Sequence, residues 1–225
     1  FSCKYCLRSP EITGKRLSKQ KLDEILDYII DTCRSNHYTH ISIQPWGGEP
    51  LLEFENVMYI HQKMKDSGIQ VNISLETNGS LITPEVAEKL TEANISVGIS
   101  IDGPREIHDA QRLTNSGKPT FEEVTSGIAC LQKAGMRNIG SISVITKDSL
   151  KELEKILDFF VKQYPDMGIK LNPMHSPGRE TARKMALEPE DMPEFAGRLI
   201  KKVTDLYKKG YVVRESRTST LLRNL

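Results

Sequence analysis

The chain has 225 residues, and its 31 basic and 30 acidic side chains leave a formal net charge of +1. Because the two signs are interspersed along the sequence, the charge pattern predicts neither a nucleic-acid partner nor a membrane-surface partner. No apolar run approaches the ~20 residues of a membrane-spanning helix, and the first residues lack the apolar stretch of a secretory signal, so we expect a cytoplasmic protein.

Signals for strands and helices alternate along the chain. Apolar residues recur at helical spacing over residues 19–36, and the alternation over 40–44 is typical of a strand. Further segments rich in β-branched residues are predicted to be strands at 71–77, 96–102, 138–146 and 167–172. Helix starts are predicted at Thr83-Pro84, at Thr120 with Glu123 as a capping box, and at Asp148.

One helix between successive strands predicts parallel pairing, because parallel neighbours need a crossover connection. Such crossovers are right-handed, so the repeats would wind into a barrel or a doubly wound sheet with the working residues at the C-terminal strand ends. The length suits one domain or one incomplete larger barrel. A last helix, expected from about 189 to 209, would cover the barrel.

The first candidate motif is Cys3-Lys4-Tyr5-Cys6. Its Cys-x-x-Cys spacing serves zinc sites, redox dithiols and iron-sulfur clusters, so the motif alone leaves these alternatives open. No second Cys-x-x-Cys or His-x-x-x-His pair follows in the sequence to complete a zinc site. The other cysteines, Cys33 and Cys130, fall within expected helices and are interpreted as structural.

The second motif, Trp46-Gly47-Gly48-Glu49-Pro50, directly follows the first expected strand. Adjacent glycines let backbone groups approach a ligand closely, and a carboxylate beside them can accept hydrogen bonds from an ammonium group. A plain Gly-Gly turn would explain the same residues, but it would not account for the other motifs.

Together these motifs resemble the radical S-adenosylmethionine (SAM) superfamily, in the branch of anaerobic sulfatase-maturating enzymes and SPASM-type peptide maturases. Residues 1–6 are similar to the end of the family's Cys-x-x-x-Cys-x-x-Cys signature, whose first cysteine would precede Phe1. Residues 47–49 match its Gly-Gly-Glu, residues 76–79 its Thr-Asn-Gly turn, and residues 100–104 with 107–109 and Arg112 a block of the same branch.

The resemblance implies a partial TIM-type (β/α)6 barrel of parallel strands, with the first strand upstream of Phe1. It implies that Cys3 and Cys6 are metal ligands of a [4Fe-4S] cluster. It also implies a set of SAM-binding residues. In that set Tyr5 contacts the adenine and Glu49 binds the methionine ammonium with Gly47 and Gly48, while Asn78 lies near the cofactor, Ser100 binds the ribose and Arg112 binds the carboxylate.

For function, the resemblance implies reductive cleavage of SAM at the cluster to a 5′-deoxyadenosyl radical, which would modify a peptide or protein substrate. Expected outcomes are a thioether or carbon–carbon crosslink, or formylglycine formation. A one-electron donor such as flavodoxin or ferredoxin is implied. Residues 1–185 would form the core, and 186–225 would form a C-terminal helix leading to a SPASM-like region with possible auxiliary iron-sulfur clusters.

Other interpretations remain open at this point. One is a non-catalytic α/β binding module with a structural zinc at Cys3 and Cys6. Another is a radical enzyme that acts on a small molecule. His108-Asp109 suggests a metal-dependent phosphohydrolase, but the further ligands that such a site needs are not patterned in the sequence.

Overall fold

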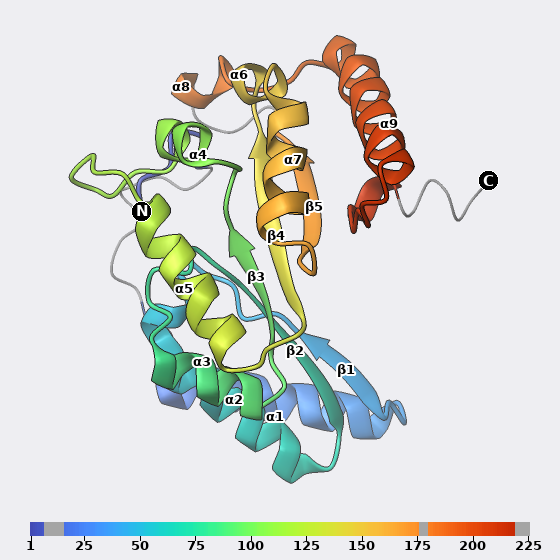
Figure 1. The fold of residues 1–225 in the computed structure, drawn as a ribbon. Helices are drawn as coiled ribbons and strands as arrows, with labels where there is room; N and C mark the ends of the chain where they lie inside the picture. The colour runs from blue at the N-terminus through green and yellow to red at the C-terminus, as the bar shows by residue number, and fades with distance from the viewer. Residues whose placement is uncertain (7–15, 176–179, 219–225) are drawn as a thin grey trace.

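The expected strands form one sheet in the computed structural model, which describes residues 1–6, 16–175 and 180–218. The sheet contains β1 (His40–Ile43), β2 (Gln70–Thr77), β3 (Ser96–Ser100), β4 (Ile139–Ile145) and β5 (Gly168–Pro173). The strands lie side by side in chain order, and each neighbouring pair is parallel. Figure 1 shows that the sheet curls from β1 to β5. The predicted fold class, an α/β partial TIM-type barrel, is confirmed, while the strand upstream of Phe1 stays a prediction.

Helices fill the connections between the strands and cover one face of the curled sheet (Figure 1). Before β2 the chain forms α1 (Lys19–Ser35), η1 (Pro50–Glu53) and α2 (Phe54–Ser67). Between β2 and β5 it forms α3 (Pro84–Glu92), α4 (Arg105–Gln111), α5 (Phe121–Lys133), α6 (Lys147–Leu150) and α7 (Leu153–Gln163). After β5 it forms α8 (Glu180–Arg183), η2 (Pro189–Asp191) and α9 (Met192–Lys208).

Two of the three predicted helix starts lie at observed N-caps, Thr83 of α3 and Thr120 of α5, but the expected capping hydrogen bond forms at Thr83 and not at Thr120. The Thr83 hydroxyl accepts a hydrogen bond from the Val86 N–H, with Pro84 in the first turn of α3. Thr120 makes no side-chain cap, because its hydroxyl donates to the Arg112 carbonyl instead. Asp148 does not cap α6 either, since Thr146 is its N-cap and forms a capping box with Ser149. Both errors arise where a tertiary partner or a neighbouring hydroxyl takes the capping role.

The core lies between the sheet and its helices. Strand residues such as Leu75, Ile99 and Leu171 are almost fully buried against helix residues that include Leu90 and Leu157. Each such burial removes a branched aliphatic side chain from water and contributes about 1.5–3 kcal/mol before entropic costs. This continuous core holds the C-terminal strand ends in fixed relative positions.

The last helix, α9, packs against α7. Phe195, Leu199, Val203 and Leu206 form its buried side, as the apolar spacing predicts. Ion pairs of Arg198 with Glu154 and Lys202 with Asp158 border this contact. The helix therefore covers the outside of the barrel at α7, as expected for the helix predicted from about 189 to 209.

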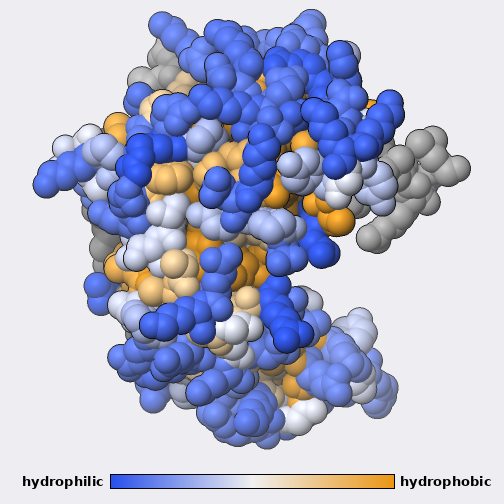
Figure 2. Space-filling model, in the orientation of Figure 1, coloured by the Kyte–Doolittle hydropathy of each residue, from blue (hydrophilic) through white to orange (hydrophobic). Residues whose placement is uncertain are grey.

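The surface in the view of Figure 2 is mostly hydrophilic, and hydrophobic residues show mainly in the band between the upper helices and α1–α3. Among the described residues, no helix combines the length and the apolar character that crossing a membrane requires. The apolar residues of this chain are thus gathered mainly in the core between helices and sheet.

Candidate active site

The motif residues gather at the C-terminal ends of the strands. Glu49 follows β1, Asn78 follows β2, and Ser100 is the last residue of β3. The N-terminal segment 1–6 reaches the same edge, because the Ser2 N–H donates to the Leu113 carbonyl (2.7 Å) and the Lys4 N–H to the Gln111 carbonyl (2.9 Å). Parallel strands thus bring motifs that are far apart in sequence to one edge of the sheet.

The two signature cysteines form a tight turn. The Cys6 N–H donates to the Cys3 carbonyl at 3.0 Å, and both side chains are half-buried. Burial raises the pKa of the Cys3 thiol, and the Arg112 guanidinium opposes part of this rise. Within the described ranges no group of three Cys, His, Asp or Glu side chains could hold a metal ion. The turn brings two cysteines to this edge of the sheet, and their role as ligands of a [4Fe-4S] cluster stays a prediction.

Asp102, two residues beyond β3, connects the cysteine loop to the barrel. Its side chain is fully buried and accepts four hydrogen bonds. The Tyr5 hydroxyl donates at 2.7 Å and the Val144 N–H at 2.9 Å, while Nε and Nη2 of Arg112 each donate at 3.0 Å. Because the carboxylate is fully paired, its burial is tolerated and the four groups are fixed together.

Arg112 and Tyr5 are therefore bound mainly to the protein itself. The Arg112 guanidinium lies 5.3 Å from the centre of the Tyr5 ring. Its burial opposes the charged form, but Asp102 outweighs this and raises the pKa of Arg112. Burial raises the pKa of Tyr5 well above its usual value. Among the described residues no partner is found for Nη1 of Arg112, whose Nε and Nη2 both bind Asp102.

His108 and Asp109 support the loop around Arg112. His108 is fully buried, with Nδ1 3.3 Å from the Asp102 N–H and Nε2 3.0 Å from the Thr120 hydroxyl. Burial lowers its pKa to about 4, so the ring is neutral at pH 7. The Asp109 carboxylate accepts the N–H groups of Thr120 and Phe121, each at 2.9 Å. Both residues have structural partners, and these contacts give the phosphohydrolase interpretation no support.

Glu49 occupies a different environment at the end of β1. Its half-buried carboxylate accepts hydrogen bonds from the Thr77 hydroxyl (2.5 Å), the Asn78 N–H (2.8 Å) and the Leu51 N–H (3.1 Å). All three donors are neutral, and in the described part of the chain no basic side chain pairs with it. The carboxylate is thus oriented but not neutralised, which suits an incoming ammonium group.

The residues around Glu49 complete this part of the site. A Cβ atom added to Gly47 would meet no described atom within 4 Å, so the space in front of it is open. The Asn78 side-chain oxygen accepts hydrogen bonds from the N–H and the hydroxyl of Ser80, and these two bonds hold the turn. Gly79 has φ +78°, a conformation that favours glycine. Asn78 therefore positions the backbone that binds Glu49.

The structure sorts the predicted residues into two contacting groups. Tyr5 and Arg112 meet at Asp102, whereas Asn78 contacts Glu49. Ser100 ends β3, two residues before Asp102, and β3 pairs with β2, where Thr77 lies opposite Ile99. The individual roles of these residues toward SAM stay predictions.

Sequence reasoning missed two residues of the site, Thr77 and Asp102. Asp102 stood inside a quoted motif, and an acidic residue at the end of a buried strand is itself a signal, because a buried carboxylate must find partners. Thr77 gave a weaker signal, as the last residue of a strand whose alternation turns it inward.

Comparison with known proteins identifies the family. The profile of the Radical SAM superfamily matches residues 1–160, so the chain belongs to this superfamily. The cysteine-type anaerobic sulfatase-maturating enzyme of Clostridium perfringens (strain 13 / Type A) is 26% identical over 221 residues, which are 94% of this chain and 58% of that protein. The serine-type enzyme of Bacteroides thetaiotaomicron is 34% identical over 143 residues, 60% of this chain and 34% of that protein.

A solved structure shows the same fold. It is described as native anSMEcpe with bound AdoMet and Cp18Cys peptide, and it superposes with a TM-score of 0.79 at 24% identity, over 95% of this chain and 59% of that one. The chain thus spans less than two thirds of the length of these relatives. Membership of the superfamily favours a radical SAM enzyme over the zinc-binding module.

Proposed function

We propose that this member of the radical SAM superfamily modifies a peptide or protein substrate. Two relatives are named as sulfatase-maturating enzymes, and the solved relative contains both AdoMet and a peptide. The products considered are a thioether or carbon–carbon crosslink, or formylglycine. Within the chain, the supporting observation is that the Cys3–Cys6 turn and the oriented Glu49, which has no basic partner among the described residues, both lie at the C-terminal edge of the sheet.

The family implies a [4Fe-4S] cluster and SAM, and the cluster when reduced supplies the electron that cleaves SAM to a 5′-deoxyadenosyl radical able to abstract hydrogen. Cys3 and Cys6 would hold two irons of this cluster. Glu49 would bind the ammonium of SAM together with Gly47 and Gly48, and the space in front of Gly47 is open. These residues contribute position and charge, which suffices because the cofactor carries the difficult chemistry.

The remaining predicted residues would bind the rest of the cofactor. Ser100 would contact the ribose, and Tyr5 would place its ring against the adenine. Arg112 would bind the carboxylate through Nη1, since Asp102 occupies Nε and Nη2. In this proposal Asp102 sets the orientation of both Tyr5 and Arg112.

Several features of the whole protein belong to the same proposal. Residues 186–225 would lead from the barrel core, 1–185, to a SPASM-like region with possible auxiliary clusters. A flavodoxin or ferredoxin would donate the electron. A cytoplasmic location is proposed, because thiols that bind a cluster need a reducing environment.

The test uses full-length protein reconstituted anaerobically with iron and sulfide, then mixed with SAM, dithionite and cysteine- or serine-containing peptides. We expect 5′-deoxyadenosine together with a change in peptide mass. Cys3→Ala and Cys6→Ala should abolish both, whereas Cys130→Ala, on α5, should leave both unchanged. A wild-type protein that carries the cluster but forms no 5′-deoxyadenosine with any peptide would disprove the proposal.

A further inference from the structure

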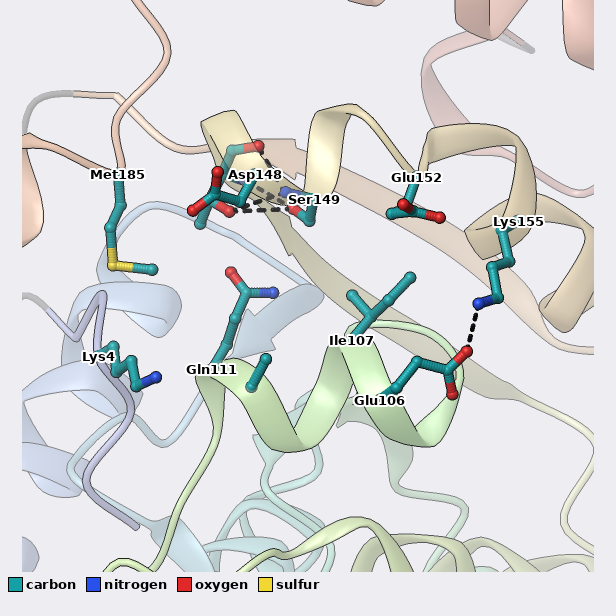
Figure 3. Close-up of a pocket in the computed structure, with 11 residues that line it drawn as sticks. Lys4, Glu106, Ile107, Gln111, Asp148, Ser149, Glu152, Lys155 and Met185 are labelled. Carbon is teal, nitrogen blue, oxygen red and sulfur yellow. Dashed lines mark hydrogen bonds and ion pairs between the residues drawn. The ribbon is translucent and has the colours of Figure 1, made fainter.

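A second feature of the same sheet edge is a cavity of about 480 Å³ beside the cysteine loop. It lies between α4, which follows β3, and the segment from α6 to the start of α7, which follows β4. Lys4, between the two cysteines of the loop in sequence, borders it on the same side as Met185 (Figure 3). Met185 forms part of the wall and also packs against the small core that contains Tyr5 and Cys3. The cavity therefore adjoins the cysteine loop through Lys4 and Met185.

Gln111 presents an unusual group to this cavity. Its side chain is 5% exposed, yet no described residue hydrogen-bonds either its amide oxygen or its amide nitrogen. Figure 3 shows the amide directed from the end of α4 toward the space between Met185 and α6. Buried amides are rarely left unpaired, because the lost hydrogen bonds with water are costly. The position of Gln111 therefore points to a ligand that supplies one acceptor and one donor.

The other walls limit the chemistry of that ligand. Ile107 and Met185 make the wall partly apolar, while Asp148 and Glu152 place carboxylates at the rim. With Glu106 these carboxylates outnumber the lining ammonium groups of Lys4 and Lys155, and Lys155 is paired with Glu106, so the charge does not favour a phosphate. No described lining residue offers an aromatic ring for a base. A metal ion is also disfavoured, since no suitable group of three ligands exists among the described residues.

An extended peptide satisfies these conditions. The N–H and C=O of one residue in a β-strand point to the same side, and a glutamine amide offers the complementary acceptor and donor side by side. Peptides commonly bind by such backbone pairing with side chains placed in adjacent pockets. The volume also falls within the usual range of ligand sites.

We propose that this cavity binds an extended segment of the peptide substrate through the side-chain amide of Gln111. The inference rests on the proposed function, which makes the substrate a peptide. The backbone carbonyl of Gln111 meanwhile accepts a hydrogen bond from the Lys4 N–H. The same residue thus binds the cysteine loop through its backbone and would bind the substrate through its side chain.

The first experiment measures binding without activity. Full-length protein with ¹⁵N-labelled glutamine side chains is titrated with acetyl-trialanine N-methylamide, and in parallel with an analogue methylated at every backbone nitrogen. We expect the Gln111 signal, identified by its absence in Gln111→Leu, to shift in a saturable way with the first probe alone. The exposed Gln62 serves as the internal control and should not shift. A Gln111 signal that ignores both probes, or responds equally to both, overturns the inference.

The second experiment separates ligand binding from a structural role. If the amide has no partner in the free protein, Gln111→Leu or Gln111→Met should leave the Tm unchanged or raise it. For any peptide that the wild type modifies, the same variants should raise KM roughly tenfold, as expected for two lost neutral hydrogen bonds, while Gln62→Leu should not. A lowered Tm or an unchanged KM contradicts this inference. A wild type that modifies no peptide contradicts the proposed function instead, and the titration still tests the cavity.

Discussion

Two carboxylates at the C-terminal side of the sheet, one after β1 and one after β3, illustrate two uses of negative charge. Asp102 is fully buried and bound by the Arg112 guanidinium together with Tyr5 and Val144. Glu49 is half-buried and accepts hydrogen bonds from neutral donors. The first carboxylate is satisfied within the chain and serves the fold. The second keeps its charge available for a cationic ligand.

This contrast matters because a buried ion pair and an oriented free charge respond differently to mutation. Removing one partner of a buried pair leaves the other uncompensated, which is expensive. Removing a charge that is partly solvated costs the fold little, but it removes attraction for a ligand. The predictions below therefore compare stability first and cofactor binding last.

The largest effect is expected for Asp102→Ala. It leaves the Arg112 charge buried without a partner, and we expect the free energy of unfolding to fall by about 3–5 kcal/mol. Denaturant unfolding of the full-length protein measures this. Replacing both partners, as Asp102→Leu with Arg112→Met, should recover much of the loss because no charge remains buried. If Glu49→Ala costs as much as Asp102→Ala, the contrast between the two carboxylates is wrong.

The next effect is a pH dependence of stability that arises from His108. The groups around its ring are Asp102, Arg112 and Asp109, and burial holds its pKa at about 4. In the unfolded chain the histidine pKa is ~6.5, so the unfolded state binds a proton more readily than the folded state does. The stabilisation of the fold by neutral His108 is therefore complete above pH ~6.5. As the pH falls from ~6.5 to about 4, the free energy of unfolding decreases by up to about 3 kcal/mol.

Unfolding curves at successive pH values test this prediction. His108→Gln keeps an amide able to hydrogen-bond and removes the titration, so its stability should depend less on pH within this window. Equal slopes for the wild type and the variant would show that His108 does not titrate as described.

A smaller loss is expected for Tyr5→Phe. The ring stays buried near Arg112, and the change removes the hydroxyl that donates to Asp102 at 2.7 Å. A hydrogen bond to a charged acceptor is worth about 2 kcal/mol, so the unfolding free energy should fall by roughly that amount. Calorimetry or denaturant unfolding measures the change, and Tyr28→Phe, at an exposed site on α1, is the matched control. A loss as small as that of the control would mean that the cysteine loop does not depend on Asp102.

The smallest effect on stability is expected for Glu49→Gln. The amide oxygen can still accept from Leu51 and Thr77, but the NH2 group cannot accept from the Asn78 N–H, so stability should fall by about 1 kcal/mol for one lost hydrogen bond. The affinity of the cluster-loaded protein for SAM should instead fall about tenfold, since a charged partner of the ammonium is lost. Isothermal titration calorimetry measures this, with the exposed Glu88→Gln as control. Unchanged SAM affinity would remove Glu49 from the cofactor site.

Local sequence signals were sufficient for most of the fold. The strands of the sheet and the α9 surface follow from hydrophobic periodicity, which depends on residues close in the chain. Helix starts were less predictable. The N–H groups at the start of α5 donate to Asp109, which lies eleven and twelve residues earlier in the chain. The local capping-box pattern at Thr120 and Glu123 does not include this residue and so did not predict its role.

The sequence by itself determined the parallel α/β architecture, the radical SAM resemblance and the strand ends at which Glu49 and Ser100 stand. The tertiary structure decided which charges are free. Asp102 meets Tyr5 across 97 residues of sequence and Val144 across 42, and the unpaired amide of Gln111 becomes apparent when α4 and α6 lie together. Whether a polar group is satisfied depends on neighbours that folding brings close, and periodicity and spacing carry no information about such partners.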